Sequence, residues 1–320
     1  MKVVHQPDPK STQLVVEDVP LPTLSRSDEF LIHVHAIMPC LNELRWEIWF
    51  PSLFAPGRER VPCTEAAGVI AKVADSEEAR ASQFKVGDEV FFRLEPSQTG
   101  NFRQYTLARL SQLAHKSKNI GWIEAGATPL SSLTAWQGIF QHGILDGKAV
   151  FGDIESRNKN SNLKVLITGA SGVVGSWAIH GDTADYVRKL GATEVIDCKK
   201  QNISDWAANQ LEREVDAAFD CVGGATLSSC WSAVKEGGIL LSVTGDPQQE
   251  KPESTTKTLA EAKWFLVEPN GRQLDKISNL QGEGKCVAKV DGVVNFANFQ
   301  EAFNKVENKK ANGKVVITID

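Results

Sequence analysis

The feature that most constrains the fold is a short apolar segment that leads directly into a glycine-rich turn. Residues 164–168 (KVLIT) are predicted to form a buried strand, and residues 169–175 (GASGVVG) form a turn that opens a helix. Such a turn brings main-chain N–H groups close to a diphosphate, which a Cβ at Gly172 would obstruct. Gly175 lets the helix pack tightly on the strand. Because Ala170 replaces the first glycine of the G-x-G-x-x-G pattern, a tight turn without a ligand is the alternative interpretation.

Short strands alternate with helices around this turn, which predicts a parallel, doubly wound sheet. The strand segments are apolar and uninterrupted, as expected for strands covered on both faces. We predict strands at residues 164–168, 194–197, 217–220 and 238–243.

Two further segments near this region have clear patterns. Residues 124–144 carry apolar side chains at helical spacing and are predicted to be helical. Residues 153–161 are polar and predict an exposed loop.

The first third of the chain predicts a small barrel or sandwich of closely spaced strands. Residues 29–36 alternate between apolar and polar, residues 68–73 are rich in β-branched side chains, and residues 84–92 place a Gly-Asp turn before a strand. With 320 residues, the chain is long enough for two domains.

Composition excludes several classes of partner. The net charge of −5 gives no attraction to nucleic acid or anionic lipid. No apolar run approaches the roughly 18 residues that a membrane helix needs, and the N-terminus has no apolar signal segment. The six cysteines are scattered, as in a reducing compartment. We therefore expect a cytoplasmic protein with a small-molecule substrate and neither nucleic acid nor membrane as a partner.

Several motifs together resemble the zinc-independent medium-chain dehydrogenases/reductases, the group of quinone oxidoreductases and enoyl reductases. The resemblance covers nearly the whole chain in order, and the motifs are specific to the superfamily but not to one substrate. They lie at residues 62–70, 84–90, 100–105, 133–136, 169–175, 187–197 and 313–317.

The resemblance implies an α/β fold with a GroES-like β-barrel catalytic domain and a Rossmann-type doubly wound parallel sheet. The expected boundaries are 1–125 and 285–320 for the catalytic domain and 126–284 for the cofactor domain, with the active site in the cleft between them. Zinc-containing members carry Gly-His-Glu where this chain has Cys63-Thr64-Glu65, and Cys40 alone cannot hold zinc. We therefore expect no metal.

The resemblance also implies the site residues. Asn42 matches an active-site asparagine that would polarise the substrate carbonyl, although a turn or helix-cap role is the alternative. Thr134 would hydrogen-bond the nicotinamide or its ribose, or is a plain helix residue. The expected substrate wall, equally a hydrophobic anchor of the barrel, consists of Arg45, Trp46, Trp49 and Phe50. The expected cofactor contacts are Thr134, Gly169, Ala170, Ser171, Gly172, Val173, Val174, Gly175, Tyr186, Cys221, Val222, Gly223, Thr244, Gly245, Phe265, Leu266 and Val267. Residues 265–267 are equally well interpreted as a core strand.

The match breaks between His180 and Gly181, where about a dozen residues, the rest of a helix and the ribose-binding strand, are absent. Three explanations stay open. A segment is missing from the sequence; the protein has lost the strand and binds cofactor poorly; or one helix runs over 172–190 and residues 194–197 form the second strand. In the last case Asp197 would be the ribose-binding acid, whereas the resemblance of 190–197 to a third strand favours the first explanation. Tyr186 would contact the adenosine phosphate, and Asp182 would oppose a 2′-phosphate.

We predict an NADPH-dependent reductase, with NADPH preferred to NADH, that transfers hydride to an α,β-unsaturated carbonyl such as an enoyl, enone or quinone. Water would protonate the enolate, and the protein would be a monomer or homodimer. The alternative is a redox-inactive protein of the same fold that acts as a cofactor-independent isomerase or cyclase, or as a binding partner.

Overall fold

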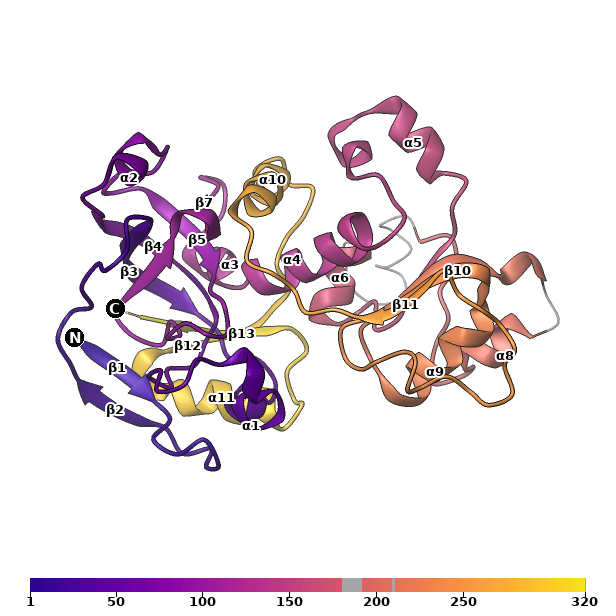
Figure 1. The fold of residues 1–320 in the computed structure, drawn as a ribbon, viewed down its shortest axis with the longest axis horizontal. Helices are drawn as coiled ribbons and strands as arrows, with labels where there is room; N and C mark the ends of the chain where they lie inside the picture. The colour runs from indigo at the N-terminus through magenta and orange to yellow at the C-terminus, as the bar shows by residue number, and fades with distance from the viewer. Residues whose placement is uncertain (180–191, 209–210, 320) are drawn as a thin grey trace. The chain divides into compact units, whose positions relative to one another are not determined.

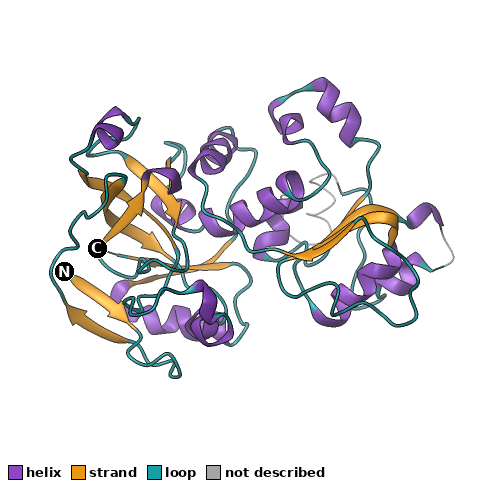
Figure 2. Ribbon diagram, in the orientation of Figure 1, coloured by secondary structure: helices purple, strands orange, loops and turns teal. Residues whose placement is uncertain are grey.

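The computed structural model describes residues 1–179, 192–208 and 211–319, which divide into two compact units (Figures 1 and 2). Unit 1 comprises Met1–Leu133 and Glu268–Asp320, and unit 2 comprises Thr134–Val267. Compared with the predicted boundaries, residues 126–133 lie in unit 1, and so do residues 268–284. The reason is that α10 (Gly271–Gly282) packs on β7 (Leu113–His115), where Ser278 Oγ donates a hydrogen bond of 2.7 Å to the His115 carbonyl oxygen.

Unit 1 is built on a seven-stranded, mostly antiparallel sheet with the order β12-β13-β3-β4-β5-β7, in which β6 pairs with β3. Only β12 and β13 pair in parallel, and β1 and β2 form a separate hairpin. The strands are β1 (Lys2–His5), β2 (Val15–Asp18), β3 (Glu29–Ile37), β4 (Glu65–Val73), β5 (Glu89–Arg93), β6 (Tyr105–Arg109), β7 (Leu113–His115), β12 (Val290–Asn295) and β13 (Lys314–Thr318).

The core of unit 1 lies between this sheet and the C-terminal helix α11 (Phe299–Glu307), which packs on β12 and β13 (Figure 1). Inward-facing side chains of β3, including Phe30, Ile32 and Val34, are fully buried in it. The predicted strands at 29–36, 68–73 and 84–92 are present as β3, β4 and β5, since their alternation matches the two faces of this sheet. The remaining helices are α1 (Trp46–Trp49), α2 (Glu77–Ala81) and α3 (Trp122–Gly126).

Unit 2 contains a four-stranded parallel sheet with the order β11-β10-β9-β8. Alternate residues of β9 and β10 enter different clusters: Ala218 and Leu240 pack with Trp231, whereas Phe219 and Leu241 pack with Phe265. Both sheet faces therefore carry apolar layers, as a parallel sheet requires. The strands are β8 (Val165–Ile167), β9 (Val215–Asp220), β10 (Val234–Ser242) and β11 (Glu261–Trp264), and the helices are α5 (Ile154–Asn160), α6 (Val173–Ile179), α8 (Ile203–Ala207) and α9 (Gly224–Ala233).

The helical prediction for residues 124–144 is largely confirmed, although the segment is divided. After the end of α3, helix α4 (Pro129–Trp136) continues into a π-helical turn at Gln137–Gln141. None of the described helices is both long and apolar enough to span a membrane.

Two predicted elements are wrong. Residues 194–197 form no strand, because the segment packs against the core beside α8: Ile196 contacts the Trp206 cluster, and Glu194 Oε1 accepts a 2.7 Å hydrogen bond from Trp206 Nε1. The polar residues 153–161 are not a loop but contain α5. Asp153 caps this helix by accepting a hydrogen bond of 2.8 Å from Ser156 N.

Candidate functional site

The glycine-rich turn follows β8 and has the predicted strand–turn–helix form. Gly169 has φ +61°, a left-handed conformation that favours glycine, and its carbonyl oxygen accepts a 2.8 Å hydrogen bond from Gly172 N. A Cβ at Gly175 would lie 2.2 Å from that same oxygen, so only glycine lets α6 begin so close to the turn. Ser171 and Gly172 are exposed. The first N–H groups of a helix have no intrahelical partner, so the open turn fits a diphosphate.

A buried carboxylate joins this turn to the neighbouring strand ends. Asp220, the last residue of β9, is fully buried, and Thr168 Oγ1 donates a 2.6 Å hydrogen bond to its Oδ1. Its Oδ2 accepts hydrogen bonds from Ser242 Oγ at 3.1 Å, Thr244 Oγ1 at 2.9 Å and Gly223 N at 2.9 Å. Asp220 therefore connects the carboxyl ends of β8, β9 and β10, the edge at which ligands bind in open α/β sheets.

The sequence singled out the loops after these strands but not Asp220 itself. The sequence signal that could have identified Asp220 was a carboxylate at the end of an otherwise apolar strand. In those loops Val222 and Thr244 are exposed, and the side chains of both lie beside glycines. Cys221, Gly223 and Gly245 are half-buried. The loops are thus accessible to a ligand at the same edge as the turn.

The remaining predicted cofactor residues lie in different settings. Phe265 is a core residue whose ring centroid lies 6.1 Å from that of Phe219, as the core interpretation anticipated, and Val267 is also buried, whereas Leu266 is partly exposed. Residues 265–267 follow β11 and are not part of a strand. Thr134 is buried on α4. Tyr186 and Asp182 lie outside the described residues.

The described sheet has no strand beyond β8, so the second strand at residues 194–197, which the third explanation requires, is not formed. Within the described ranges β8 pairs only with β9, and its three residues are half-buried instead of fully buried. Asp197 is not at a strand end but in a turn, where it accepts a 3.0 Å hydrogen bond from Lys199 N. The hypothesis that Asp197 binds the ribose from the end of a second strand is therefore wrong.

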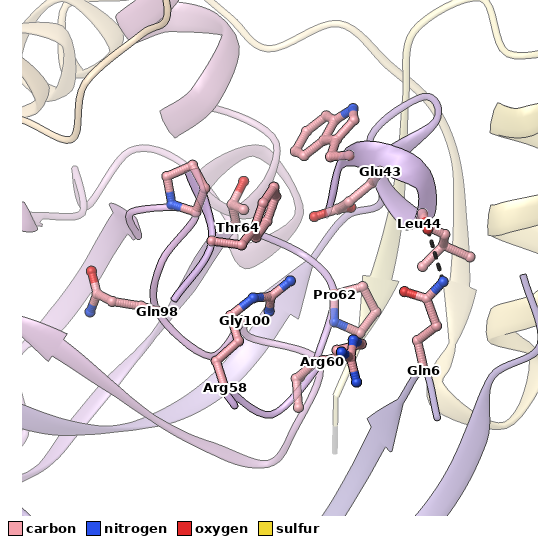
Figure 3. Close-up of a pocket in the computed structure, with 13 residues that line it drawn as sticks. Gln6, Glu43, Leu44, Arg58, Arg60, Pro62, Thr64, Gln98 and Gly100 are labelled. Carbon is pink, nitrogen blue, oxygen red and sulfur yellow. Dashed lines mark hydrogen bonds between the residues drawn. The ribbon is translucent and has the colours of Figure 1, made fainter. Parts of the chain in front are cut away.

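Unit 1 contains a small pocket of its own, with a cavity volume of about 20 Å³, which is room for about one water molecule, and it is partly open to solvent (Figure 3). Its lining is polar and apolar in nearly equal parts, whereas ligand pockets are usually lined mainly by apolar side chains. The lining residues are Gln6, Glu43, Leu44, Trp46, Phe54, Arg58, Arg60, Val61, Pro62, Thr64, Pro96, Gln98 and Gly100.

Two arginines of the pocket share one carboxylate. Arg58 Nη2 donates to Glu47 Oε2 at 3.3 Å, and Arg60 Nε donates to the same oxygen at 3.0 Å. The guanidinium of Arg58 also lies over the Phe54 ring, 4.6 Å from its centroid. Burial lowers the pKa of Arg58, although arginine stays charged at any physiological pH.

Glu43 is held at the pocket by main-chain donors. Its Oε1 accepts from Cys63 N at 2.8 Å and its Oε2 from Cys40 N at 3.0 Å. Burial raises its pKa from 4.5 to about 7, against the lowering effect of these hydrogen bonds. Burial, together with the nearby Glu43, raises the pKa of both thiols well above the usual value. The thiols are therefore neutral and poor nucleophiles.

The predicted substrate-binding residues do not all line the same site in the structure. Trp46 lines the pocket, whereas Trp49 and Phe50 are exposed on the adjoining segment and Arg45 is exposed before α1. Asn42 adopts a left-handed conformation with φ 59°, and its main-chain N–H donates a 2.7 Å hydrogen bond to Glu307 Oε1 of α11. The sequence did not single out Glu43, Arg58 or Thr64 as pocket residues, because they come from separate segments of the chain and no single pattern joins them.

The donor groups near the pocket do not fit a zinc site. Both oxygens of Glu43 are used by main-chain donors, and Glu65 Oε1 lies 2.7 Å from Lys314 Nζ while its Oε2 accepts from Leu130 N at 2.7 Å. Among the described residues, no group of three or more histidine, cysteine or carboxylate side chains could hold a metal ion. The six cysteines are all free.

Known proteins are similar to this chain in sequence and in fold. The Zinc-binding dehydrogenase family matches residues 190–317. A "Probable zinc-binding oxidoreductase, mitochondrial" of Arthroderma benhamiae is 36% identical over 338 residues, which cover 97% of this chain and 98% of the relative. An "NADPH-dependent alkenal/one oxidoreductase, chloroplastic" of Arabidopsis thaliana is 30% identical over 80% of this chain and 63% of that protein. A solved structure described as a putative zinc-dependent alcohol dehydrogenase protein from Rhizobium etli CFN 42 superposes with a TM-score of 0.79 at 24% identity, over 100% of this chain and 98% of that chain.

The fold and these relatives define an α/β oxidoreductase with a GroES-like domain and a Rossmann-type sheet, which confirms the predicted fold class. The chain belongs to the zinc-binding dehydrogenase family of the medium-chain dehydrogenase/reductase superfamily. The alignment with the Arthroderma relative spans 338 positions, which is more than the 320 residues of this chain. The Arthroderma protein therefore carries residues that this chain lacks.

Proposed function

We propose that the protein is a zinc-independent, NADPH-dependent reductase of α,β-unsaturated carbonyl compounds. The observation that carries the proposal is the turn at Gly169–Gly175, which is exposed at Ser171 and Gly172 and is joined through Asp220 to the loops after β9 and β10. The carboxyl ends of β8, β9 and β10 are therefore held together at the edge of the sheet where dinucleotides bind. The name of the Arabidopsis relative supports both NADPH and a conjugated carbonyl substrate.

The residues present fit a nicotinamide dinucleotide. The turn would hold the diphosphate, and the accessible loops at Cys221–Gly223 and Thr244–Gly245 would contact the rest of the cofactor. When bound, the reduced nicotinamide supplies the hydride. Because the pocket residues do not fit zinc, hydrogen-bond donors must polarise the substrate carbonyl. Asn42 and Thr134 stay predictions for that role.

One observation favours the second candidate, a redox-inactive protein of the same fold. The described sheet ends at β8, so the strand whose end would bind the adenosine ribose is not among its four strands. A chain that lacks this strand would bind NADPH weakly. It would then use the same fold for isomerisation, cyclisation or binding of a partner.

Titration with NADPH, followed by cofactor fluorescence, separates the two candidates. The reductase binds NADPH more tightly than NADH and oxidises it, with a loss of absorbance at about 340 nm that depends on an added enone. No binding to the intact chain would leave only the second candidate. The intact mass of the protein isolated from its own cells tests whether residues between His180 and Gly181 are missing from this sequence.

Location and assembly are further proposals. We infer a cytoplasmic protein that acts on a small molecule as a monomer or homodimer. The name of the Arthroderma relative places that protein in the mitochondrion, which is the competing location. Cell fractionation with an antibody distinguishes the two locations, and light scattering of the purified chain gives the assembly.

A further inference from the structure

Two histidines lie side by side on one strand of unit 1. His33 and His35 are two positions apart on β3, and the centroids of their imidazole rings are 4.8 Å apart with an interplanar angle of 67°. Both residues are half-buried, whereas Val34 between them is fully buried in the core. Because alternate side chains of a strand share one face, the two imidazoles lie together outside this core.

Each imidazole is held by an aromatic neighbour from another element. Tyr105 of β6 stacks on His33 with ring centroids 4.8 Å apart, and Trp122 of α3 stacks on His35 at 4.6 Å, with interplanar angles of 27° and 20°. These contacts use the ring faces, whereas the nitrogens lie at the ring edges. A half-turn about χ2 exchanges the edges of an imidazole and keeps its plane, so a nitrogen of each ring can face the other without loss of the stacking.

A β-bulge fixes the main chain at this pair. The register of β3 with β4 shifts between Val34 and Ala36, so His35 is one extra residue in β3. Its carbonyl oxygen accepts a 2.9 Å hydrogen bond from Ile319 N. Bulges redirect side chains and are common beside functional sites, which makes the close approach of His35 to His33 a built feature of the strand.

The separation of the two rings suits a shared metal ion. A transition-metal ion binds an imidazole nitrogen at about 2.0–2.1 Å. Two imidazoles on one ion, at the bond angles of about 90–110° found in octahedral and tetrahedral coordination, would have ring centroids about 4.5–5.2 Å apart. The observed 4.8 Å lies within this interval.

The charge beside the pair does not oppose a cation. Lys116 Nζ lies 5.1 Å from the centroid of the Trp122 ring, but it pairs with Glu89 Oε2 at 2.9 Å. It also donates a 2.8 Å hydrogen bond to the Ile120 carbonyl oxygen. The positive charge of this lysine is therefore balanced by a neighbouring carboxylate.

We propose that His33 and His35 bind one divalent transition-metal ion, each through a ring nitrogen, with water molecules at the remaining coordination positions. Imidazole is a suitable ligand for Ni²⁺, Cu²⁺ and Zn²⁺, and Cu²⁺ binds most tightly of the three to a given site. The site contains neither the Cys63–Glu65 segment nor the glycine-rich turn. It is therefore independent of the proposed reductase activity.

Calorimetric titration of the untagged full chain with NiCl₂ tests the site. Ni²⁺ is the probe because free thiols reduce Cu²⁺, and the parent protein carries Cys198→Ser because Cys198 is an exposed free cysteine. We expect one Ni²⁺ per chain. His33→Phe and His35→Phe remove the ring nitrogens but keep a flat ring for stacking. Each should therefore raise the Kd at least about 10-fold, as expected when a metal site loses a ligand, while the melting temperature without metal stays the same.

His115→Phe is the matched control. His115 also stacks on an aromatic ring, that of Phe84, with centroids 4.6 Å apart and an interplanar angle of 26°. Its Nε2 lies 3.2 Å from Asp88 Oδ2, and no second imidazole stacks on it within the described part of the chain. This substitution should leave the Kd for Ni²⁺ unchanged.

A crystal of the full chain soaked in NiCl₂ locates the ion independently, and we expect one anomalous peak between the rings of His33 and His35. An unchanged Kd in either phenylalanine variant of the pair, or a peak that contacts only one of the two imidazoles, would overturn the proposal. Neither measurement involves NADPH or an enone, so failure of the metal site leaves the proposed function standing, and failure of the reductase leaves the metal site standing.

Discussion

Lys314 Nζ lies 2.7 Å from Glu65 Oε1 in a pair that joins β13 to β4, although 249 residues separate the two in sequence. Both side chains are almost completely buried. The second oxygen of Glu65 accepts from Leu130 N at the start of α4. One carboxylate thus ties the C-terminal strand, a central strand and a helix together, and it does so at the position where zinc-containing members carry the glutamate of Gly-His-Glu.

Removal of the lysine should strongly destabilise unit 1. Lys314→Met leaves the Glu65 carboxylate buried and without its ionic partner, which typically costs about 3–5 kcal/mol of unfolding free energy. Lys2→Met is the control: Lys2 pairs with Asp18 at 3.1 Å, but both side chains are exposed. Such pairs contribute about 0–1 kcal/mol. Urea unfolding measures both variants, and equal losses would contradict a special role for the buried pair.

Asp220→Asn should weaken cofactor binding. The amide replaces one acceptor oxygen by a donor, which conflicts with N–H and O–H groups that all point at this side chain. We expect the Kd for NADPH to rise about 10-fold, equivalent to about 1.4 kcal/mol, as the turn and the two loops lose their common anchor. Fluorescence titration gives the Kd.

Asp216→Asn is the matched control for this experiment. Asp216 lies on the same strand but near its other end, where its Oδ2 accepts from Lys164 N at 2.7 Å. The variant should bind NADPH like the wild type. If both substitutions weaken binding equally, the effect is general loss of sheet stability and not the organisation of strand ends.

Alanine at two glycines of the turn should give different results. In Gly175→Ala the new Cβ would lie 2.2 Å from the Gly169 carbonyl oxygen, so α6 must move and the variant should lower the melting temperature of unit 2. In Gly172→Ala the same oxygen is 3.1 Å away, which a small adjustment relieves. This variant should stay folded but raise the Kd for NADPH, since the methyl group points toward the expected diphosphate. Calorimetry and fluorescence titration measure the two effects, and a Gly172→Ala protein with normal affinity would contradict the predicted ligand position.

Sequence patterns predicted the elements whose formation depends on their own residues. The alternation at 29–36 matches β3, and the glycines at 169 and 175 sit where the backbone requires them. The same reasoning failed at residues 194–197, because an apolar run does not determine whether a strand finds a neighbour. The sequence reasoning also failed at α5. This segment is polar, but Asp153 caps its first turn and stabilises a helix there.

The candidate sites were harder to predict than the fold. The role of Asp220 depends on Thr168 and Ser242, which lie 52 and 22 residues away and meet it only when the strands pair. The pocket likewise brings together Arg58, Thr64 and Glu43 from separate segments that no single sequence pattern joins. Local patterns carry no information on such contacts, so only the tertiary structure brings these residues together.

The raised pKa of Glu43 predicts how the unfolding free energy of the protein changes with pH. Because burial raises its pKa from 4.5 to about 7, the folded protein binds more protons at this group than the unfolded chain between these two values. The contribution of Glu43 to unfolding free energy therefore falls as pH rises from about 4.5 to about 7 and stays low above that range. The total loss is about 3 kcal/mol, since each pKa unit corresponds to about 1.4 kcal/mol. Urea unfolding of wild type and Glu43→Gln at pH 5 and pH 8 measures it: the variant cannot titrate here, so the stability of wild type relative to the variant should be lower at pH 8. A difference that does not change with pH would show that Glu43 ionises normally in the pocket.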